Sequence, residues 1–147
     1  MAASNLPDAP SWAERLLERA RVARLGLLDA AGHPRVLPVT FAPAEGRIWT
    51  AVDEKPKRDP GEELARVRFL RRDARAALTV DRYSDDWREL AWVQVLGEVE
   101  VLEPTEAEAG LAALVKKYEQ YRKSKPAGPL LALSPRRCLW WSARELG

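Results

Sequence analysis

Three cations, Lys55, Lys57 and Arg58, directly follow a strand-like run and could hold a phosphate group. Ammonium and guanidinium groups bind phosphate oxygens through charge-assisted hydrogen bonds. The two strand-like runs before them, residues 35–41 and 47–52, can bring backbone groups and small side chains to the flat face of an aromatic cofactor. This layout predicts a phosphate-binding loop at the rim of a barrel. The same cations also fit an ordinary solvated turn, because surface Lys and Arg are common.

Other side chains with catalytic chemistry are scarce in this chain. Cys138 is the only cysteine and His33 the only histidine. An intrachain disulfide, most zinc sites and any mechanism with two imidazoles are therefore excluded. His33 lies in a Gly-His-Pro turn, a poor position for a Ser-His-Asp triad. Cys138 lies in an apolar strand-like run, which favours a buried structural thiol over a reactive thiolate.

The overall charge and hydropathy exclude two further classes of partner. The 147 residues carry 24 basic and 22 acidic side chains, a formal charge of +2, which lacks the clustered positive excess of a nucleic-acid-binding surface. No run of about 18 apolar residues is present to span a bilayer, and the start, with Asp8 and Glu14, does not resemble a signal peptide. We expect a cytoplasmic protein with one domain at residues 11–147 behind a flexible lead-in at residues 1–10.

The segments that must position the basic loop have mostly the pattern of strands with hairpin turns. Apolar or alternating runs predict strands at residues 25–30, 35–41, 47–52, 75–83, 90–102, 130–133 and 137–143. Pro38 indicates an edge strand or a bulge, and Gly97 permits a bend that closes the sheet. The first three strands follow each other too closely for crossover helices, which disfavours a parallel doubly wound sheet. The predicted fold is a small antiparallel barrel that removes its edges by closing.

Three helices are predicted around this barrel. Two capping-box patterns, Ser11 with Glu14 and Thr105 with Glu108, open helices that run to about residues 23 and 122. A short helix at residues 62–72 covers one end of the barrel.

Six motifs, in their order and spacing, connect the chain to a known family. They are ArgValLeuProValThr at 35–40, LysProLys at 55–57, LeuArgArgAspAlaArg at 70–75, ValAspArgTyrSerAspAspTrp at 80–87, TrpValGlnValLeuGly at 92–97 and LysTyrGluGlnTyrArg at 117–122. Over about residues 12–143 the chain resembles the split-barrel flavin-binding superfamily named for pyridoxamine 5′-phosphate oxidase. It is most similar to the small members that use the deazaflavin coenzyme F420. The resemblance implies a mainly β (α+β) antiparallel split barrel of six or seven strands with about three peripheral helices.

The resemblance also implies a cofactor held in a cleft between two subunits. The implied cofactor-binding residues are Arg35, Val39, Thr40, Thr50, Ala51, Lys55, Lys57, Arg58 and Trp92. Residues at the ends of the second and third strands would contact the ring system. The three cations of the loop would hold the phosphate, and Arg35 would add positive charge for a longer anionic tail. Trp92 would wall the cleft or stack on the cofactor, with core packing as the alternative.

One departure from the family pattern bears on the choice of cofactor. The flavin-dependent oxidases carry a lysine where this chain has Thr40. Losing that cation penalises a compact monophosphate, whereas the longer, multiply charged tail of F420 can be held further along the loop. We therefore expect an F420-dependent reductase that transfers hydride to an unknown small organic substrate, with FMN as the alternative cofactor. A non-catalytic carrier, or a module for another planar ligand such as haem, is the other alternative, and His33 is the only imidazole available to haem iron.

The same family pattern leads us to expect a homodimer. A short barrel with an open cleft gains both burial and a complete site by two-fold pairing. The candidate interface anchors are Trp49, Trp87, Trp92, Trp140 and Trp141. The hydride chemistry would belong to the cofactor, so the absence of an acid–base constellation is no objection. Tyr83, Tyr118 and Tyr121 could donate a proton to a reduced substrate, although packing is the commoner role of such phenols.

Overall fold

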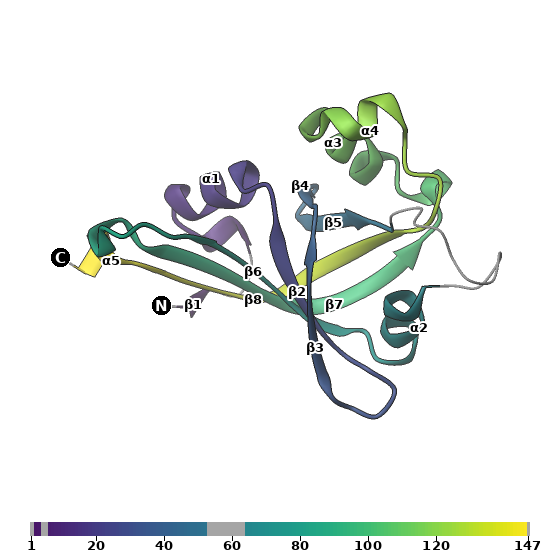
Figure 1. Cartoon of the computed structure of the whole chain (residues 1–147), viewed down its shortest axis with the longest axis horizontal. Coiled ribbons are helices and arrows are strands. Elements are labelled where there is room, and N and C mark those ends of the chain that lie inside the picture. Colours follow the sequence, from purple (N-terminus) through teal and green to yellow (C-terminus); the bar gives the residue numbers. More distant parts are fainter. Residues whose placement is uncertain (1, 4–5, 53–63, 147) are drawn as a thin grey trace.

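The computed structural model describes residues 2–3, 6–52 and 64–146 and shows one antiparallel sheet with helices around it (Figure 1). The strands are β1 (Ala2–Ala3), β2 (Ala23–Leu28), β3 (Pro34–Val39), β4 (Ala42–Ala44), β5 (Arg47–Ala51), β6 (Arg75–Arg82), β7 (Ala91–Leu102) and β8 (Leu130–Ser142). The α-helices are α1 (Ser11–Arg19), α2 (Ala65–Arg72), α3 (Glu108–Lys117), α4 (Glu119–Lys123) and α5 (Ala143–Leu146). Short 3-10 helices are η1 (Leu6–Asp8), η2 (Trp87–Glu89) and η3 (Pro104–Glu106). The predicted mainly β, antiparallel architecture is confirmed. No helix in the described ranges is long and apolar enough to cross a membrane.

The sheet curls until its two edge strands come close to each other without pairing. The strand order is β3-β2-β6-β7-β8-β5-β4, with β1 paired to β8. β3 and β4 therefore lie at opposite ends of the order, although only Thr40 and Phe41 separate them along the chain. The end of β3 lies within about 11 Å of the start of β4, the reach of three residues. We call this junction the seam.

The seam corrects one prediction and agrees with another. The sheet is a split barrel and is not closed, so the expectation that closure removes its edges was wrong. Pro38 lies on an edge strand, as predicted, where a residue without an N–H group is tolerated.

The long β7–β8 ladder carries the bend of the sheet. The register between these strands shifts between Leu96 and Gly97, and a Cβ atom on Gly97 would overlap the carbonyl oxygen of Ser134. Only glycine permits this close approach, in agreement with the bend predicted there. The two closing strands expected at the C-terminus form a single strand, because Ser134 and Pro135 continue the pairing across the bulge instead of ending it.

The helix boundaries differ from the capping-box predictions. α1 begins at Ser11 itself, with Pro10 as its N-cap and no side-chain cap, and Ala23 already belongs to β2. Pro10 fixes its own φ as the N-cap, and the helix starts one residue earlier than the pattern implies.

The segment predicted as one helix to about residue 122 is divided into η3, α3 and α4. A capping box is present, but Glu103 and Glu106 form it around Pro104. Tyr118 adopts an extended backbone conformation between α3 and α4, so the helical spacing of the sequence concealed a break.

Two clusters of buried side chains hold the molecule together. The larger lies inside the curl of the sheet and packs α1 and α2 against β2, β6, β7 and β8. The smaller packs α3 and α4 on β5 and β8 around Trp49, and a Cβ atom on Gly110 would overlap its ring. Trp49 and Trp140 are 1% and 8% exposed, so neither can anchor a partner, contrary to prediction.

Candidate functional site

A small pocket of about 160 Å³ lies at the seam, and we call it the seam pocket. Its lining comes from the end of β3 and the residue after it, the end of β5, the residue before β2 and the first turn of α2. The lining residues are Val22, Pro38, Val39, Thr40, Thr50, Ala51 and Arg66. Four residues predicted to contact a cofactor, Val39, Thr40, Thr50 and Ala51, therefore share one pocket.

Strand register explains why these residues meet. Continuing the β4–β5 register past its first pair places Thr40 opposite Ala51. On the other side of the seam Val39 pairs with Ala23, the neighbour of Val22. Both edges of the sheet thereby deliver residues to the same small volume.

Thr50 lines this pocket and carries a buried polar atom without a hydrogen bond. The residue is 5% exposed, and its Oγ1 is the one buried side-chain nitrogen or oxygen in the described part of the chain that makes no hydrogen bond. Leaving a buried polar group unsatisfied costs roughly 1–3 kcal/mol. Valine would fill the same space without that cost, which makes the Thr50 hydroxyl group a candidate for a hydrogen bond to a ligand.

Thr40 presents a second hydroxyl group, supported from behind by a tyrosine. Its Oγ1 lies 2.6 Å from the hydroxyl oxygen of Tyr121, and either atom can donate. Tyr121 belongs to α4 and is 9% exposed. If the more acidic phenol donates, the Thr40 proton is left for a ligand.

Tyr118, three residues earlier, has a structural role. Its hydroxyl group accepts a hydrogen bond from the Phe41 N–H (3.1 Å) and lies 3.0 Å from the carbonyl oxygens of Arg21 and Phe41, to either of which it can donate. Burial raises the pKa of this phenol, while the Phe41 N–H and Arg21 act in the opposite direction. Tyr118 therefore ties the Thr40–Phe41 link to the end of α1. Tyr83 is 68% exposed and bonds to Asp85, away from the pocket.

Lys117 lies beside this tie and is half-buried. Its Nζ is 3.8 Å from the centroid of the Phe41 ring and 3.5 Å from the carbonyl oxygen of Leu17. Burial, with a smaller contribution from the Arg21 charge, lowers the pKa of Lys117 to about 8. The aromatic ring and the carbonyl favour the ammonium form but do not offset its desolvation.

The described cation of the pocket is Arg66, which sequence reasoning missed. It lies in the first turn of α2, the helix that follows the predicted phosphate loop. The only signal was its position directly after that loop, because α2 also carries other arginines at similar spacing. Lys55, Lys57 and Arg58 lie outside the described residues.

Two predicted residues lie elsewhere. Arg35 is about 13 Å along β3 from Val39, the length of four strand residues. It pairs with Asp29 at 3.7 Å and lines a different groove. Trp92 lies opposite Trp141 on the outward-facing side of β7 and is 37% exposed.

Comparison with known proteins assigns the chain to a family. The profile of the pyridoxamine 5′-phosphate oxidase family matches residues 11–142. The chain belongs to this family. Its fold is the flavin-binding split barrel of that superfamily, as the sequence motifs predicted. No curated protein sequence matches the chain significantly.

Solved structures of this family share the fold at low sequence identity. A conserved hypothetical protein from Mycobacterium tuberculosis has a TM-score of 0.76 and 19% identity, with 99% of this chain and 91% of that one covered. A heme binding protein from Mycobacterium smegmatis has a TM-score of 0.69 and 23% identity, with 90% and 55% covered. An F420 reductase has a TM-score of 0.63 and 18% identity, with 90% and 98% covered.

Proposed function

We propose that this family member is a coenzyme F420-dependent oxidoreductase that transfers hydride to a small organic substrate. The observation that carries the proposal is the seam pocket, where Thr40 and the unpaired Thr50 hydroxyl group lie together. F420 supplies the hydride chemistry when bound, and the protein supplies orientation, hydrogen bonds and exclusion of water. The similarity to an F420 reductase supports this choice of cofactor.

The residues of the pocket fit one polar edge of a planar ring system. The Thr50 hydroxyl group gains a partner on binding, and the Thr40 hydroxyl group can donate to a carbonyl oxygen while it accepts from Tyr121. Arg66 places positive charge beside that edge. We assign the phosphate to Lys55, Lys57 and Arg58, as the sequence predicted.

The pocket is too small to enclose such a cofactor by itself. Its volume is about 160 Å³, whereas ligand pockets usually measure about 300–1,000 Å³. We infer that a second copy of the chain completes the cleft, so that the active form is a homodimer.

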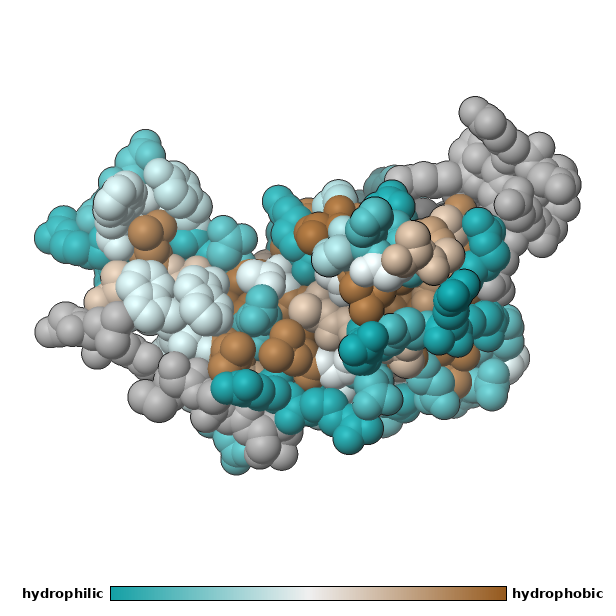
Figure 2. All heavy atoms as spheres, turned by 90° about the horizontal axis from the view of Figure 1, so that it is seen from below, coloured by the Kyte–Doolittle hydropathy of each residue, from teal (hydrophilic) through white to brown (hydrophobic). Residues whose placement is uncertain are grey.

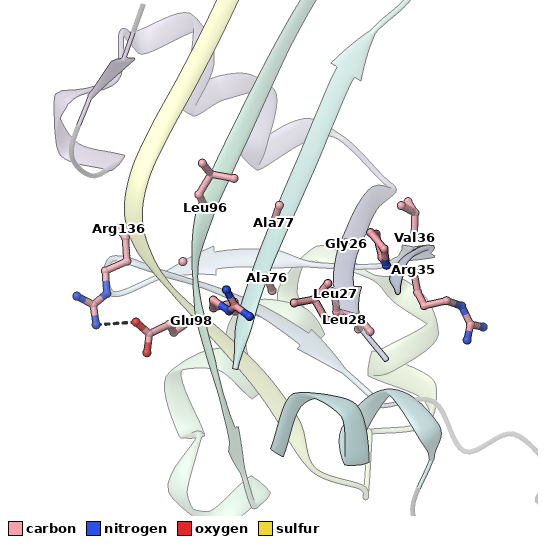
Figure 3. Close-up of a pocket in the computed structure, with 13 residues that line it drawn as sticks. Gly26, Leu27, Leu28, Arg35, Val36, Ala76, Ala77, Leu96, Glu98 and Arg136 are labelled. Carbon is pink, nitrogen blue, oxygen red and sulfur yellow. Dashed lines mark ion pairs between the residues drawn. The ribbon is translucent and has the colours of Figure 1, made fainter. Parts of the chain in front are cut away.

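The outer face of the sheet is the surface that fits a second copy. Val36, Gly26, Ala77 and Leu96 lie side by side across β3, β2, β6 and β7. They line a groove of about 500 Å³ (Figure 3). Val36 is 71% exposed although it is apolar.

The rim of this groove carries charges of both signs. Arg136 forms a 2.8 Å ion pair with Glu98 at one end, and Arg35 lies at the other (Figure 3). Seen from the side on which β3 projects, apolar residues gather in the middle of the molecule between hydrophilic ones (Figure 2). An apolar centre within a polar rim is typical of protein interfaces. Trp92 and Trp141 extend the outer face toward the C-terminal end of β8, which supports their predicted role as anchors.

Two alternatives differ in the cofactor. FMN fits the same pocket and family, but Thr40 replaces the lysine expected beside its phosphate. The similarity to a heme binding protein favours a second planar ligand. However, His33 lies in the turn between β2 and β3 and does not line the seam pocket. If FMN is the cofactor, the protein is a flavin enzyme. If the protein binds a cofactor but has no substrate, it is a non-catalytic carrier. The cytoplasmic location expected from the sequence remains part of our proposal.

The proposal is tested by reducing F420 enzymatically and mixing it with the purified protein and a panel of activated alkenes and quinones. We expect the deazaflavin absorbance to return only when protein and acceptor are both present. Thr50→Val should lower the affinity for F420 about tenfold, the loss of one hydrogen bond to the ring. Thr79→Val makes the same substitution on β6, outside the pocket, and is the control that should leave affinity unchanged. Failure of the parent to bind F420 would refute the proposal.

A further inference from the structure

We propose that a pocket at the far end of the sheet binds a small dianion, the doubly charged oxyanion of a phosphate monoester or a dicarboxylate. This pocket has a volume of about 360 Å³ and lies where α1 begins and where β6 and β8 end. We call it the arginine pocket. It is lined by Trp12, Arg15, Arg82, Glu89, Ser142 and Arg144. It shares no residue with the seam pocket and does not depend on the function proposed there.

The lining has an excess of positive charge. Three guanidinium groups, those of Arg15, Arg82 and Arg144, accompany a single carboxylate, that of Glu89. Gathering three like charges costs free energy unless counter-charge is supplied. A bound dianion supplies the two charges that Glu89 leaves uncompensated.

Glu89 orients two of these arginines. Its carboxylate forms an ion pair with Arg144, and its backbone carbonyl oxygen accepts a hydrogen bond from Nε of Arg82 at 2.8 Å. The bond to Nε leaves both terminal nitrogens of Arg82 available. A guanidinium fork held in this way is prepared for bidentate contact with an oxyanion, since less side-chain entropy is lost on binding.

Arg15 provides the third guanidinium group without any competing partner. It lies on α1, and no hydrogen bond or ion pair within the described residues involves it. All of its donors therefore remain for a ligand. An arginine that only solubilised the surface would not need to share a pocket with two others.

A neighbouring pocket on the other side of the Glu89–Arg144 ion pair lacks this excess of positive charge. There Arg88 donates two hydrogen bonds to Asp86, at 2.9 Å from both Nε and Nη2. That arginine is neutralised by its own carboxylate. The uncompensated charge is thus confined to the side that faces Trp12.

Two further residues define the shape of the pocket. Trp12 is half-buried and lines the pocket, so its indole group lies close to a bound anion. Ser142 is 5% exposed and lies on the same face of β8 as the buried Trp140, toward the core. Its hydroxyl group adds a neutral donor at the base of the pocket. The lining therefore combines the three guanidinium groups with one neutral donor and one aromatic wall.

The experiment is a titration of ¹⁵N-labelled full-length protein followed by the indole N–H signals. The Trp12 signal is assigned by its loss in Trp12→Phe. The probes are phenyl phosphate, inorganic phosphate, malonate and, as the neutral analogue, benzyl alcohol. We expect saturable shifts of the Trp12 signal with phenyl phosphate or malonate and none with benzyl alcohol. A response to phenyl phosphate alone identifies a phosphate monoester site, and a response to malonate alone identifies a dicarboxylate site.

Matched variants separate a built site from general charge attraction. Arg15→Gln should weaken binding about fivefold, a typical loss for an exposed ionic contact. Arg19→Gln makes the same charge change on the same helix, outside the pocket, and should have less than about a twofold effect. Because Arg15 makes no hydrogen bond or ion pair within the described residues, both variants should unfold at the parent temperature. Absence of any Trp12 shift, an equal response to benzyl alcohol, or equal losses in the two variants would overturn the proposal.

Discussion

The seam pocket and the outer face of the sheet are built from the same strands but differ in what supports them. The seam pocket is backed by the second core cluster, in which Trp49, Tyr118 and Tyr121 fix its walls from behind. The outer face carries apolar side chains such as Val36 and Trp92 that remain exposed in the single chain. A polar site can be held by a rigid buried layer, whereas an exposed apolar surface gains its burial from a partner. The comparison supports our proposal that the seam recognises the ligand and that the outer face mediates assembly.

The largest expected effect is the difference in stability lost when a tryptophan is removed from each of the two regions. Trp49→Ala should lower the free energy of unfolding by about 3–5 kcal/mol, because it empties the cluster behind the seam. Trp92→Ala should lower it by less than about 1 kcal/mol for the monomer, since the side chain is partly exposed. Urea denaturation at low protein concentration measures both values. Similar losses in the two variants would contradict the division between a supported and an unsupported region.

The two neighbouring tyrosines sharpen the comparison within the supported layer. Tyr118→Phe should cost about 1–3 kcal/mol of stability, because the Phe41 N–H is left without its partner. Tyr121→Phe should cost less, about 1 kcal/mol, and should mainly weaken F420 binding through Thr40. Thermal unfolding and fluorescence titration of both variants test this order. A stronger effect of Tyr118→Phe on affinity than on stability would reverse the assigned roles.

Removing the unpaired hydroxyl group of Thr50 should change stability and cofactor affinity in opposite directions. Thr50→Val should raise the stability of the cofactor-free protein by about 1 kcal/mol, because a buried group without a hydrogen bond is replaced by a methyl group. The same variant should bind F420 more weakly. Calorimetry of the free and F420-saturated proteins measures both changes. Lower stability of the cofactor-free variant would show that Thr50 already has a partner in solution.

The smallest expected effect concerns pH. The pKa of Lys117 is about 8 in the folded protein against an unfolded value of 10.5. The unfolded chain therefore binds more protons than the folded one between these values, and stability should rise as the pH increases through 8. We expect a gain of about 0.5–1 kcal/mol from pH 7 to 9, reduced by solvent screening of a half-buried group. Lys117→Gln should remove it.

Another group acts in the opposite direction as the pH approaches 9, so the range ends there. Burial raises the pKa of the Cys138 thiol from 9.0 to about 11, so stability falls as the unfolded chain loses this proton. Urea denaturation at pH 7, 8 and 9 distinguishes the two contributions. An unchanged pH profile in Lys117→Gln would refute the role given to Lys117.

The sequence predicted the features that depend on local pattern. Val39, Thr40, Thr50 and Ala51 lie at strand ends, and hairpin spacing together with the family motifs was sufficient to associate them. Arg35 lies at the other end of β3 from the seam pocket, and a strand pattern does not say which end of the strand reaches the pocket.

Features that depend on the meeting of distant segments could not be predicted. The open seam results from the curl of the whole sheet, and no single strand encodes it. The extended backbone at Tyr118 interrupts a helical pattern so that its hydroxyl group can reach Phe41, a contact across the fold. Nothing in the sequence distinguishes Arg66 from the other arginines of α2, because it reaches the seam pocket only through the packing of α2 beside the seam.

The central claim, that the seam is an F420 site, is tested most directly by one paired titration. Apo-protein is titrated with oxidised F420 and with FMN in the same buffer, and quenching of tryptophan fluorescence reports binding. We predict a dissociation constant for F420 at least about tenfold lower than for FMN, and a reversal toward FMN in Thr40→Lys, which adds a cation for a compact phosphate. Tighter FMN binding by the parent protein, or purification as a yellow FMN complex, would contradict the claim.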